Sequence, residues 1–389
     1  MRTFSKILNR ILNESFIPSL SPSSRSFSFH LIAAQNQYKN SKLLMKHLKT
    51  SNLNMDCMRL VHNFKAALLK EFGDELVIKD LPSISKLNES EVRIKVLRCA
   101  VNVADTLTCS GKYDQEPKLP FIPGYEFSGE ILEIGSKVKN LYVGDKVIGL
   151  NKDNYSAMAT ECISQERDLW KIPQDVSIDS AAALVDSYAT VLIAARRANL
   201  KEHDTVLVTV AAGGLGLAAV DLAANLFNAK VIGACDTEDK ANILREKGAF
   251  STVNYSKKEL VKRVMKETNN EGVKIIFDAV GGEIFEDCLQ CISPEGSIVV
   301  LGFSSRKIPQ ILTSQLLPKS CALIGVSLTH YQRMINETYR NAVQEVINMY
   351  LEEFIDPHVA EHFKLKDVND ALKHVEDGKS AGKVILDMS

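Results

Sequence analysis

A glycine-rich turn near the middle of the chain has the residue types and spacing to hold a phosphate group. Gly213, Gly214, Leu215 and Gly216 lie between an apolar, β-branched run and a segment of helical periodicity. Gly213 and Gly214 can take positive φ and let the backbone approach a ligand closely, and Gly216 lets the helix pack tightly on the strand. The helix N-terminus would offer free N–H groups and a positive dipole end to a pyrophosphate. This strand–turn–helix context predicts a dinucleotide site.

The residues that select between NAD and NADP should follow the second strand. Asp236 lies 20 residues after Gly216, a spacing that suits a carboxylate bound to the ribose 2′-OH of NAD. Lys240 follows closely, and a lysine here could pair with the 2′-phosphate of NADP. It could equally be a solvated residue of the first helical turn. The residues themselves leave the choice between the two dinucleotides open.

Thiols and imidazoles form no strong metal motif. Of the eight cysteines, only Cys288 and Cys291 form a CxxC, and they lie in a segment that reads as helix. We expect core thiols, in a protein suited to a reducing compartment. His358 and His362 have helical metal spacing but no third ligand, and Pro357 beside them favours a surface turn.

The elements that position these residues alternate between strand and helix over residues 186–325. Apolar, β-branched runs typical of buried parallel strands are separated by segments of helical periodicity. Six strands with crossovers predict an α/β doubly wound sheet, followed by one long helix. Strands are expected at 205–210, 230–235, 251–254, 274–278, 297–301 and 322–326, and helices at 215–227, 240–247, 283–292 and 332–351.

The two flanking regions have a different, β-rich texture. Short alternating runs separated by turn residues occur between residues 64 and 149, and another run covers 382–387. The terminal run would most simply rejoin the sheet of the first region. The net charge of −1 gives no basic footprint for nucleic acid. No apolar stretch is expected to reach the roughly 20 residues that cross a bilayer.

The N-terminal segment differs from the rest of the chain. Residues 1–55 contain eight Lys or Arg and a single acid, Glu14, and a short amphipathic helix is followed by a serine-rich tract over 21–28. This texture is typical of a mitochondrial presequence. The alternatives are a disordered extension, or sequence ahead of an internal start at Met55 or Met58, in a cytoplasmic protein. Residues 1–58 are therefore set apart from the fold.

Several motifs, in order over residues 62–389, together resemble the quinone oxidoreductase branch of the medium-chain dehydrogenase/reductase superfamily. Three of them are the glycine turn, the Phe277–Gly282 run and the Ser380–Val384 run. The others are Asn102–Asp105, Ser110–Tyr113, Pro123–Gly129 and Gly144–Val147. The resemblance implies a GroES-like catalytic domain of residues 59–185 and 326–389, with a Rossmann domain of 186–325 inserted. It implies reduction of quinones or enones, usually with NADPH, in a homodimer.

The chain departs from the family pattern at three positions. Val210 stands where the glycine turn of many members begins with glycine, and a slight change of turn geometry is expected. Leu107 replaces a frequent tyrosine, which alters the pocket wall. Asp236 replaces a small neutral residue common in members that use NADPH. NADP(H) is therefore the favoured cofactor and NAD(H) remains possible.

The resemblance also implies chemistry without zinc. Zinc-dependent relatives carry a cysteine where Asn102 stands and a histidine where Tyr125 stands, and they need three protein ligands around an open position. Asn102 and Tyr113 are instead the predicted catalytic residues. The Asn102 amide and the Tyr113 hydroxyl would donate hydrogen bonds to the substrate oxygen as negative charge develops there. Their alternatives are a turn-stabilising asparagine and an aromatic residue that caps the β-rich domain.

Other cofactor contacts are implied by position in the family. Thr190 would lie near the nicotinamide and Tyr255 near the adenosine ribose, while Lys383 could reach the cofactor or be an ordinary strand residue. The remaining predicted contacts follow the fourth and fifth strands of the Rossmann domain, at the carboxyl ends where this fold binds ligands: Val280, Gly302 and Phe303.

Two other functions stay open. A mitochondrial enoyl-thioester reductase would also place a tyrosine 11 residues after this asparagine, and would suit the presequence. A dinucleotide-binding protein without catalysis, acting in RNA binding, as a lens-type protein or as a scaffold, is the other. The sequence favours a quinone or enone reductase over both.

Overall fold

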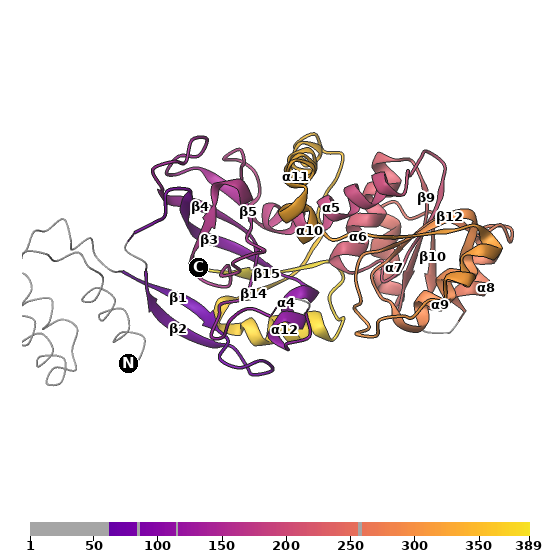
Figure 1. Cartoon of the computed structure of the whole chain (residues 1–389), viewed down its shortest axis with the longest axis horizontal. Coiled ribbons are helices and arrows are strands. Elements are labelled where there is room, and N and C mark those ends of the chain that lie inside the picture. The colour runs from indigo at the N-terminus through magenta and orange to yellow at the C-terminus, as the bar shows by residue number, and fades with distance from the viewer. Residues whose placement is uncertain (1–61, 84–85, 114–115, 256–258) are drawn as a thin grey trace, which may run out of the picture. The chain divides into compact units, whose positions relative to one another are not determined.

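The computed structural model describes residues 62–83, 86–113, 116–255 and 259–389 (Figure 1). The predicted presequence, residues 1–58, lies outside the described residues. The two β-rich regions and the alternating region predicted from the sequence are all present. Two large sheets and a hairpin of β1 (Asn63–Leu68) with β2 (Val77–Pro82) carry the fold.

The alternating region forms a parallel six-stranded sheet, which confirms the doubly wound prediction. Its strand order is β10-β9-β8-β11-β12-β13. The chain runs outward from β8 to β10 and then returns to continue outward from β11 to β13, so the switch point lies between β8 and β11. The strands are β8 (Thr205–Val208), β9 (Lys230–Cys235), β10 (Ser251–Asn254), β11 (Val273–Asp278), β12 (Ile292–Val300) and β13 (Ala322–Gly325).

Helices cover both faces of this sheet. Alternate residues of β8 point to opposite faces, so Val206 and Val208 join one core while Leu207 joins the other. The first core is shared with α6, α7, α5 (Ile178–Arg197) and α11 (Asn336–Leu351), and the second with α8 and α9. The bounds are α6 (Gly214–Asp221), continued by a π-helix over Leu222–Leu226, α7 (Glu238–Glu246), α8 (Leu260–Glu267) and α9 (Gly282–Cys291). Cys288 and Cys291 are free thiols buried in the second core, as expected.

The second sheet contains the strands of both chain ends. Its order is β14-β15-β3-β4-β5-β7, and β6 also pairs with β3. β15 pairs antiparallel with β3, Val384 opposite Val101, so the terminal run does rejoin the first region. The strands are β3 (Glu91–Val101), β4 (Glu126–Ile134), β5 (Lys146–Leu150), β6 (Glu161–Gln165), β7 (Leu169–Lys171), β14 (Val359–Lys364) and β15 (Lys383–Asp387).

The helix α5 (Ile178–Arg197) connects the two sheets, because it packs against strands β3, β4 and β5 and against α6 and α11. The predicted domain boundary at residues 185 and 186 falls inside it. By length and composition α5 could cross a membrane, contrary to the expectation that no apolar stretch is long enough. However, 78% of its most apolar window is buried inside the protein, so its hydrophobicity serves the core.

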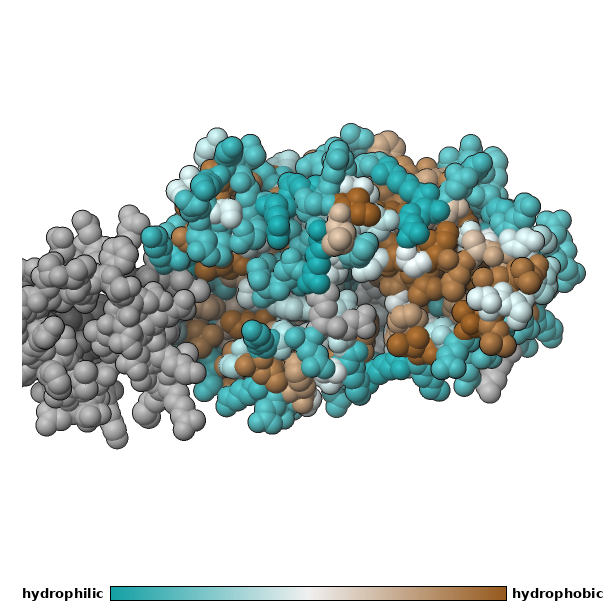
Figure 2. Space-filling view, viewed as in Figure 1, coloured by the Kyte–Doolittle hydropathy of each residue, from teal (hydrophilic) through white to brown (hydrophobic). Residues whose placement is uncertain are grey.

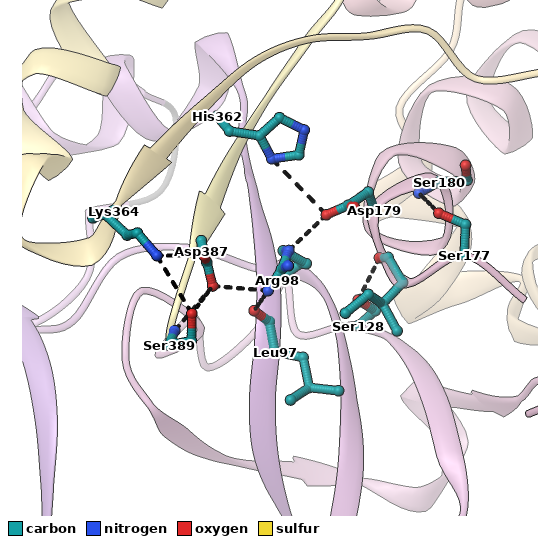
Figure 3. Close-up of polar contacts among 11 residues, drawn as sticks. Leu97, Arg98, Ser128, Ser177, Asp179, Ser180, His362, Lys364, Asp387 and Ser389 are labelled. Carbon is teal, nitrogen blue, oxygen red and sulfur yellow. Dashed lines mark hydrogen bonds and ion pairs between the residues drawn. The ribbon is translucent and has the colours of Figure 1, made fainter.

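An ion cluster fixes the start of α5 to the C-terminal strands (Figure 3). Arg98 on β3 donates from Nε to Asp179 at 2.6 Å and from Nη1 to Asp387 at 2.8 Å. Lys364 on β14 donates to the other oxygen of Asp387 at 2.8 Å. His362 lies 3.9 Å from Asp179 and belongs to β14, so the surface turn expected around it is wrong. The predicted turn residues extend because β14 pairs with β15.

The long helix predicted over residues 332–351 is two helices. α10 (Leu328–Met334) ends at Ile335, whose φ of −135° is not helical, and α11 (Asn336–Leu351) begins directly after it. Gln332 is buried and donates to Asp168 at 2.8 Å, which fixes the direction of α10. The remaining helices are α4 (Val103–Cys109) and α12 (Val368–Glu376), with short 3-10 turns at Glu166–Asp168, Thr313–Gln315, Leu317–Lys319 and Leu365–Asp367.

Candidate active site

The glycine turn after β8 starts helix α6, as predicted, but its backbone differs from the expectation. Gly213 is the extended N-cap residue, with φ of −76°, and Gly214 is the first helical residue, so neither has positive φ. The left-handed residue is Val210, with φ of +43°. A β-branched residue rarely takes this conformation. The turn therefore keeps the geometry that suits glycine at its first position, at a cost in strain.

Two glycines are needed for close approach instead. A Cβ on Gly216 would lie 2.3 Å from the Val210 carbonyl oxygen, so the predicted tight packing is confirmed. A Cβ on Gly214 would lie 2.9 Å from Cδ of Lys383. The first N–H groups of α6, from Gly214 and Leu215, have no acceptor within the helix. The turn thus fits a dinucleotide pyrophosphate, at the switch point of the sheet.

The end of β9 holds the residues predicted to select the cofactor. Lys240 Nζ lies 2.9 Å from Asp236 Oδ1 and donates to the Gly378 carbonyl oxygen at 2.9 Å. The Asp236 side chain remains 38% exposed. Asn254, which precedes Tyr255, donates from Nδ2 to the Asp236 carbonyl oxygen at 3.0 Å, and burial and the charge of Asp236 raise the pKa of Tyr255 to about 12. The structure therefore brings Asp236, Lys240 and Tyr255 together.

The loops after β11 and β12 hold the remaining predicted dinucleotide contacts. The buried Asp278 carboxylate accepts hydrogen bonds from Thr209 Oγ1 at 2.8 Å, Val280 N at 3.1 Å and Gly281 N at 3.1 Å. A Cβ on Gly281 would lie 2.9 Å from the Phe303 ring and Gly281 has φ of +70°. Val280, Gly302 and Phe303 are thus gathered at the carboxyl ends of adjacent strands, with Asp278 as their anchor.

The C-terminal strand reaches from the glycine turn to the second sheet. Gly382 pairs with Gly213, and the Lys383 stem packs over Gly214. Lys383 Nζ lies 2.6 Å from both Asn102 Oδ1 and Glu126 Oε2. The Lys383 side chain is 4% exposed and that of Glu126 is fully buried. The ammonium group of Lys383 is therefore engaged by the protein, while its stem contacts the dinucleotide turn.

Asn102 directly follows β3 and is the N-cap residue of α4. Its Nδ2 donates to Glu126 Oε2 at 3.0 Å, and its backbone N–H donates to Asp105 at 2.8 Å. Glu126 Oε1 accepts from the backbone N–H of Asp186 at 2.9 Å. Burial raises the pKa of Asp105 to about 7, although hydrogen bonds from Asn102 and Gly124 oppose this shift. Asn102 is thus held at both ends of its amide group.

A small pocket opens beside this network. Its lining comes from α4, the loop after β5, α10 and the Tyr113 loop: Ala104, Thr108, Tyr113, Tyr125, Lys152, Tyr155 and Thr329. Tyr125 OH donates to Asp186 Oδ2 at 2.9 Å. Lys152 Nζ lies 2.6 Å from Asp186 Oδ1 and 4.1 Å from the centre of the Tyr125 ring. The predicted proton donor Tyr113 therefore shares a pocket with a lysine.

Thr190 lies one helical turn after Asp186 on α5, where its Oγ1 donates to the Asp186 carbonyl oxygen at 2.6 Å. Lys152 and Asp186 belong to no motif, so the sequence did not predict them as site residues. Glu126 lies within the Pro123–Gly129 motif, but no role was predicted for it. The buried position of an acid inside an apolar strand is the signal that marks Glu126 as partnered.

Comparison with known proteins agrees with this geometry. Residues 88–192 match the family model described as alcohol dehydrogenase GroES-like domain, and residues 214–348 the one described as zinc-binding dehydrogenase. Quinone oxidoreductase-like protein 2 homolog from Nematostella vectensis is 41% identical over 326 residues, 83% of this chain and 89% of the relative. Quinone oxidoreductase-like protein 2 from Bos taurus is 40% identical, over 84% of this chain and 93% of the relative.

A solved structure extends the likeness to three dimensions. The Escherichia coli quinone oxidoreductase, described as complexed with NADPH, matches this chain with a TM-score of 0.77 and is 26% identical to it. The match covers 84% of this chain and 99% of that structure. On sequence, fold and site architecture together, the chain is an oxidoreductase that belongs to the quinone oxidoreductase-like family of the medium-chain dehydrogenase/reductase superfamily.

Proposed function

We propose that this protein reduces quinones or α,β-unsaturated carbonyls with a nicotinamide dinucleotide. The observation that carries the proposal is the continuous path from the glycine turn to the pocket. Lys383 packs on Gly214 at one end and binds Asn102 at the other. Helix α4, which Asn102 caps, supplies Ala104 and Thr108 to the pocket wall. A dinucleotide on the turn would therefore lie next to a pocket that contains hydrogen-bond donors.

The residues at the strand ends would hold the dinucleotide. The α6 N-terminus suits the pyrophosphate, Asp236, Lys240 and Tyr255 the adenosine ribose, and the walls at Val280 and Phe303 the rest. NADP(H) is the favoured cofactor, supported by the relative described as complexed with NADPH. NAD(H) remains possible because the Asp236 carboxylate holds Lys240. When bound, the reduced cofactor supplies a hydride.

The pocket residues would stabilise the negative charge that develops on the substrate oxygen. Tyr113 can donate its hydroxyl proton there. Asn102 uses one amide hydrogen for Glu126 and has a second to donate. Preorganised donors of this kind act without reorganisation at the moment of reaction. Thr190, anchored on Asp186, would line the nicotinamide side of the same space.

We also propose that no zinc takes part. Asn102 and Tyr125, at the two positions where zinc-dependent relatives carry ligands, offer an amide and a phenol rather than a thiolate and an imidazole. Their polar atoms are hydrogen-bonded to Glu126 and Asp186. Activity should be unchanged after chelation and after addition of zinc. Loss of activity on chelation with recovery on zinc would refute this part.

The test of the function is steady-state oxidation of NADPH and NADH with an ortho-quinone, an enone and crotonyl-CoA as acceptors. We expect turnover with the quinone or the enone. Selective turnover of crotonyl-CoA would favour the enoyl-thioester reductase, and dinucleotide binding without turnover would favour the non-catalytic protein. Tyr113→Phe should lower turnover while cofactor binding is kept, and the exposed Tyr142→Phe serves as its matched control. Unchanged turnover in Tyr113→Phe would exclude it as the proton donor.

We propose that the protein is a homodimer that pairs through β13. This strand is an edge of the parallel sheet. Large apolar side chains near it are exposed, among them Ile308, Leu312, Leu317 and Leu323. Hydrophobic residues also reach the surface over the parallel sheet in Figure 2. Light scattering should give a dimer for the natural chain and a monomer for Leu323→Lys.

The basic N-terminal segment, residues 1–58, is proposed to direct the chain to mitochondria. The proposal rests on its composition alone. A fusion of residues 1–58 to a fluorescent protein should be imported into mitochondria. A diffuse cytoplasmic signal would contradict the proposal.

A further inference from the structure

The pocket contains a lysine that the family resemblance does not assign. Lys152 lies two residues after the end of β5, in a loop that contributes Lys152 and Tyr155 to the pocket. Tyr155 and Ser156 in this loop have φ of +52° and +79°, conformations that non-glycine residues rarely adopt. Asn151, which is buried, holds the loop by donating to the Ile163 carbonyl oxygen at 3.1 Å. The loop thus fixes Lys152 in a defined place at the pocket wall.

Lys152 lines the pocket and has few polar contacts with the protein. Its side chain is 10% exposed and lines the pocket with Tyr113, Tyr125 and Tyr155. Among the described residues, its ammonium group contacts Asp186 Oδ1 at 2.6 Å and the face of the Tyr125 ring. The Asp186 contact is an ion pair. Because an ammonium group carries three N–H donors, it can donate to a ligand without losing Asp186.

Asp186 holds the lysine in place through the 2.6 Å ion pair. Burial alone would raise the pKa of Asp186, but the charges of Lys152 and Lys383 and the hydrogen bond from Tyr125 outweigh it, so the pKa is lowered. Tyr125 donates to Asp186 and also presents its ring face to Lys152. The three residues therefore support one another. Asp186 and Tyr125 act as positioning residues for the lysine.

We propose that Lys152 is the oxyanion-binding residue of the pocket, donating to the substrate oxygen that becomes negative on reduction. The proposal rests on the proposed function and adds to it. Hydride addition to the β-carbon of an enone, or to a quinone, moves an electron pair onto the carbonyl oxygen. Lys152 stabilises that enolate or hydroquinone anion, and a proton then arrives from Tyr113 or water. The substrate class is an aromatic or conjugated carbonyl whose reduced form is a phenolate or enolate, with tyrosine rings as walls.

The test uses a nitrophenol as a stable mimic of the oxyanion, in the absence of any cofactor. Its phenol and phenolate forms differ in absorbance, so titration of the bound ligand against pH reports which form the pocket prefers. The protein should bind the phenolate preferentially. Asp105 could also titrate in this range, because its pKa is raised to about 7 and its charge interacts with that of Lys152. The same titration of Asp105→Asn separates its contribution from that of the bound phenol.

Lys152→Met should weaken phenolate binding by roughly tenfold or more, and binding of the neutral phenol by much less. Lys152→Gln keeps a donor without the charge and should show the same selective loss, which guards against misfolding of one variant. Lys171→Met is the matched control. Lys171 also pairs with an aspartate, Asp145 at 2.7 Å, and faces a tyrosine ring, but on an exposed surface. Equal phenolate preference in Lys152→Met and the natural chain would overturn the proposal.

Turnover separates this proposal from the function on which it rests. Lys152→Met should lower kcat with a quinone or enone by about 100-fold, as removal of an oxyanion donor does, with a smaller change in KM. Lysine-dependent phenolate binding in a protein without any reductase activity would refute the proposed function and support the oxyanion site. Reductase activity that is unchanged in Lys152→Met would refute the oxyanion site and leave the function standing.

Discussion

Two lysine–carboxylate pairs lie beside each other in the site and differ in surroundings. Lys383 and Glu126 are 2.6 Å apart, with 4% and 0% of their side chains exposed. Lys152 and Asp186 are also 2.6 Å apart, with 10% and 15% exposed. The first pair shares its hydrogen bonds with Asn102 and with the backbone of Asp186, while the second lines the pocket. The same chemical pair therefore holds the fold in one place and presents a donor in the other.

The largest effect on stability should come from breaking the buried pair of Lys383 and Glu126. Lys383→Met keeps a stem to pack on Gly214 but leaves Glu126 buried without its cation. Removing one partner of a buried pair costs about 3–5 kcal/mol. The free energy of unfolding, measured with urea at neutral pH, should fall by that amount.

Lys364→Met is the control for this measurement, since Lys364 is 54% exposed in its pair with Asp387. Its loss should stay below about 1 kcal/mol. The double variant Lys383→Met with Glu126→Gln should recover part of the stability, because no uncompensated charge remains. Equal losses of unfolding free energy in Lys383→Met and Lys364→Met would show that the Lys383–Glu126 pair does not behave as a buried pair.

Asp105 is a buried carboxylate of the same site that has backbone N–H groups as its donors in place of a lysine. Its pKa is raised from 3.8 to about 7, mainly by burial. Between these values the folded chain binds a proton that the unfolded chain has lost. The contribution of Asp105 to the free energy of unfolding is therefore fully present below about pH 4. It falls as pH rises toward 7, by up to about 1.4 kcal/mol per pH unit. Asp105→Asn should flatten the dependence of unfolding free energy on pH, and a slope equal to that of the natural chain would contradict the assignment.

Gly214→Ala tests whether the buried Lys383–Glu126 pair and the glycine turn before α6 depend on each other. The added Cβ would lie 2.9 Å from the Lys383 stem, which is tied at its other end to Glu126. The crowding should cost about 1–3 kcal/mol of stability and weaken NADPH binding, measured by fluorescence titration. Gly325→Ala meets no atom within 4 Å and is the control. Full NADPH affinity in Gly214→Ala would separate the pair from the turn.

The smallest effect on stability should come from the pocket pair. Lys152→Met leaves Asp186 with the Tyr125 hydroxyl as donor and with partial exposure to water. The loss should be about 1–2 kcal/mol, below that of Lys383→Met, as judged from urea unfolding of both. A loss as large as that of Lys383→Met would place Lys152 among structural residues.

Much of the fold follows from local patterns. The strand at 230–235 is β9 as predicted, because a buried parallel strand is an unbroken apolar run. The glycine turn and its helix follow from the same reasoning. The prediction of one long helix over residues 332–351 was wrong, because the apolar periodicity continues across the break at Ile335. The pattern did not show that Val210, rather than Gly213 or Gly214, takes the left-handed position, or that Gly214 and Gly216 serve close packing.

The site was predictable only where motifs carry it. Asn102 and Tyr113 lie in family motifs, and the structure places one beside the pocket and one in it. The Lys383 contact to Asn102 spans 281 residues and depends on how β15 pairs with β3. Lys152 and Asp186 meet because the loop after β5 packs against α5. No local periodicity encodes either contact, so the ion pairs that organise the site emerge only in the folded chain.

Isotope transfer is the most direct test of hydride reduction in this pocket. NADPH deuterated at nicotinamide C4 is supplied with an enone, and the product is examined by mass spectrometry and NMR. We predict one deuterium at the β-carbon, with the α-proton drawn from solvent. Oxidation of the cofactor without deuterium in the product, or no turnover despite tight cofactor binding, would contradict it.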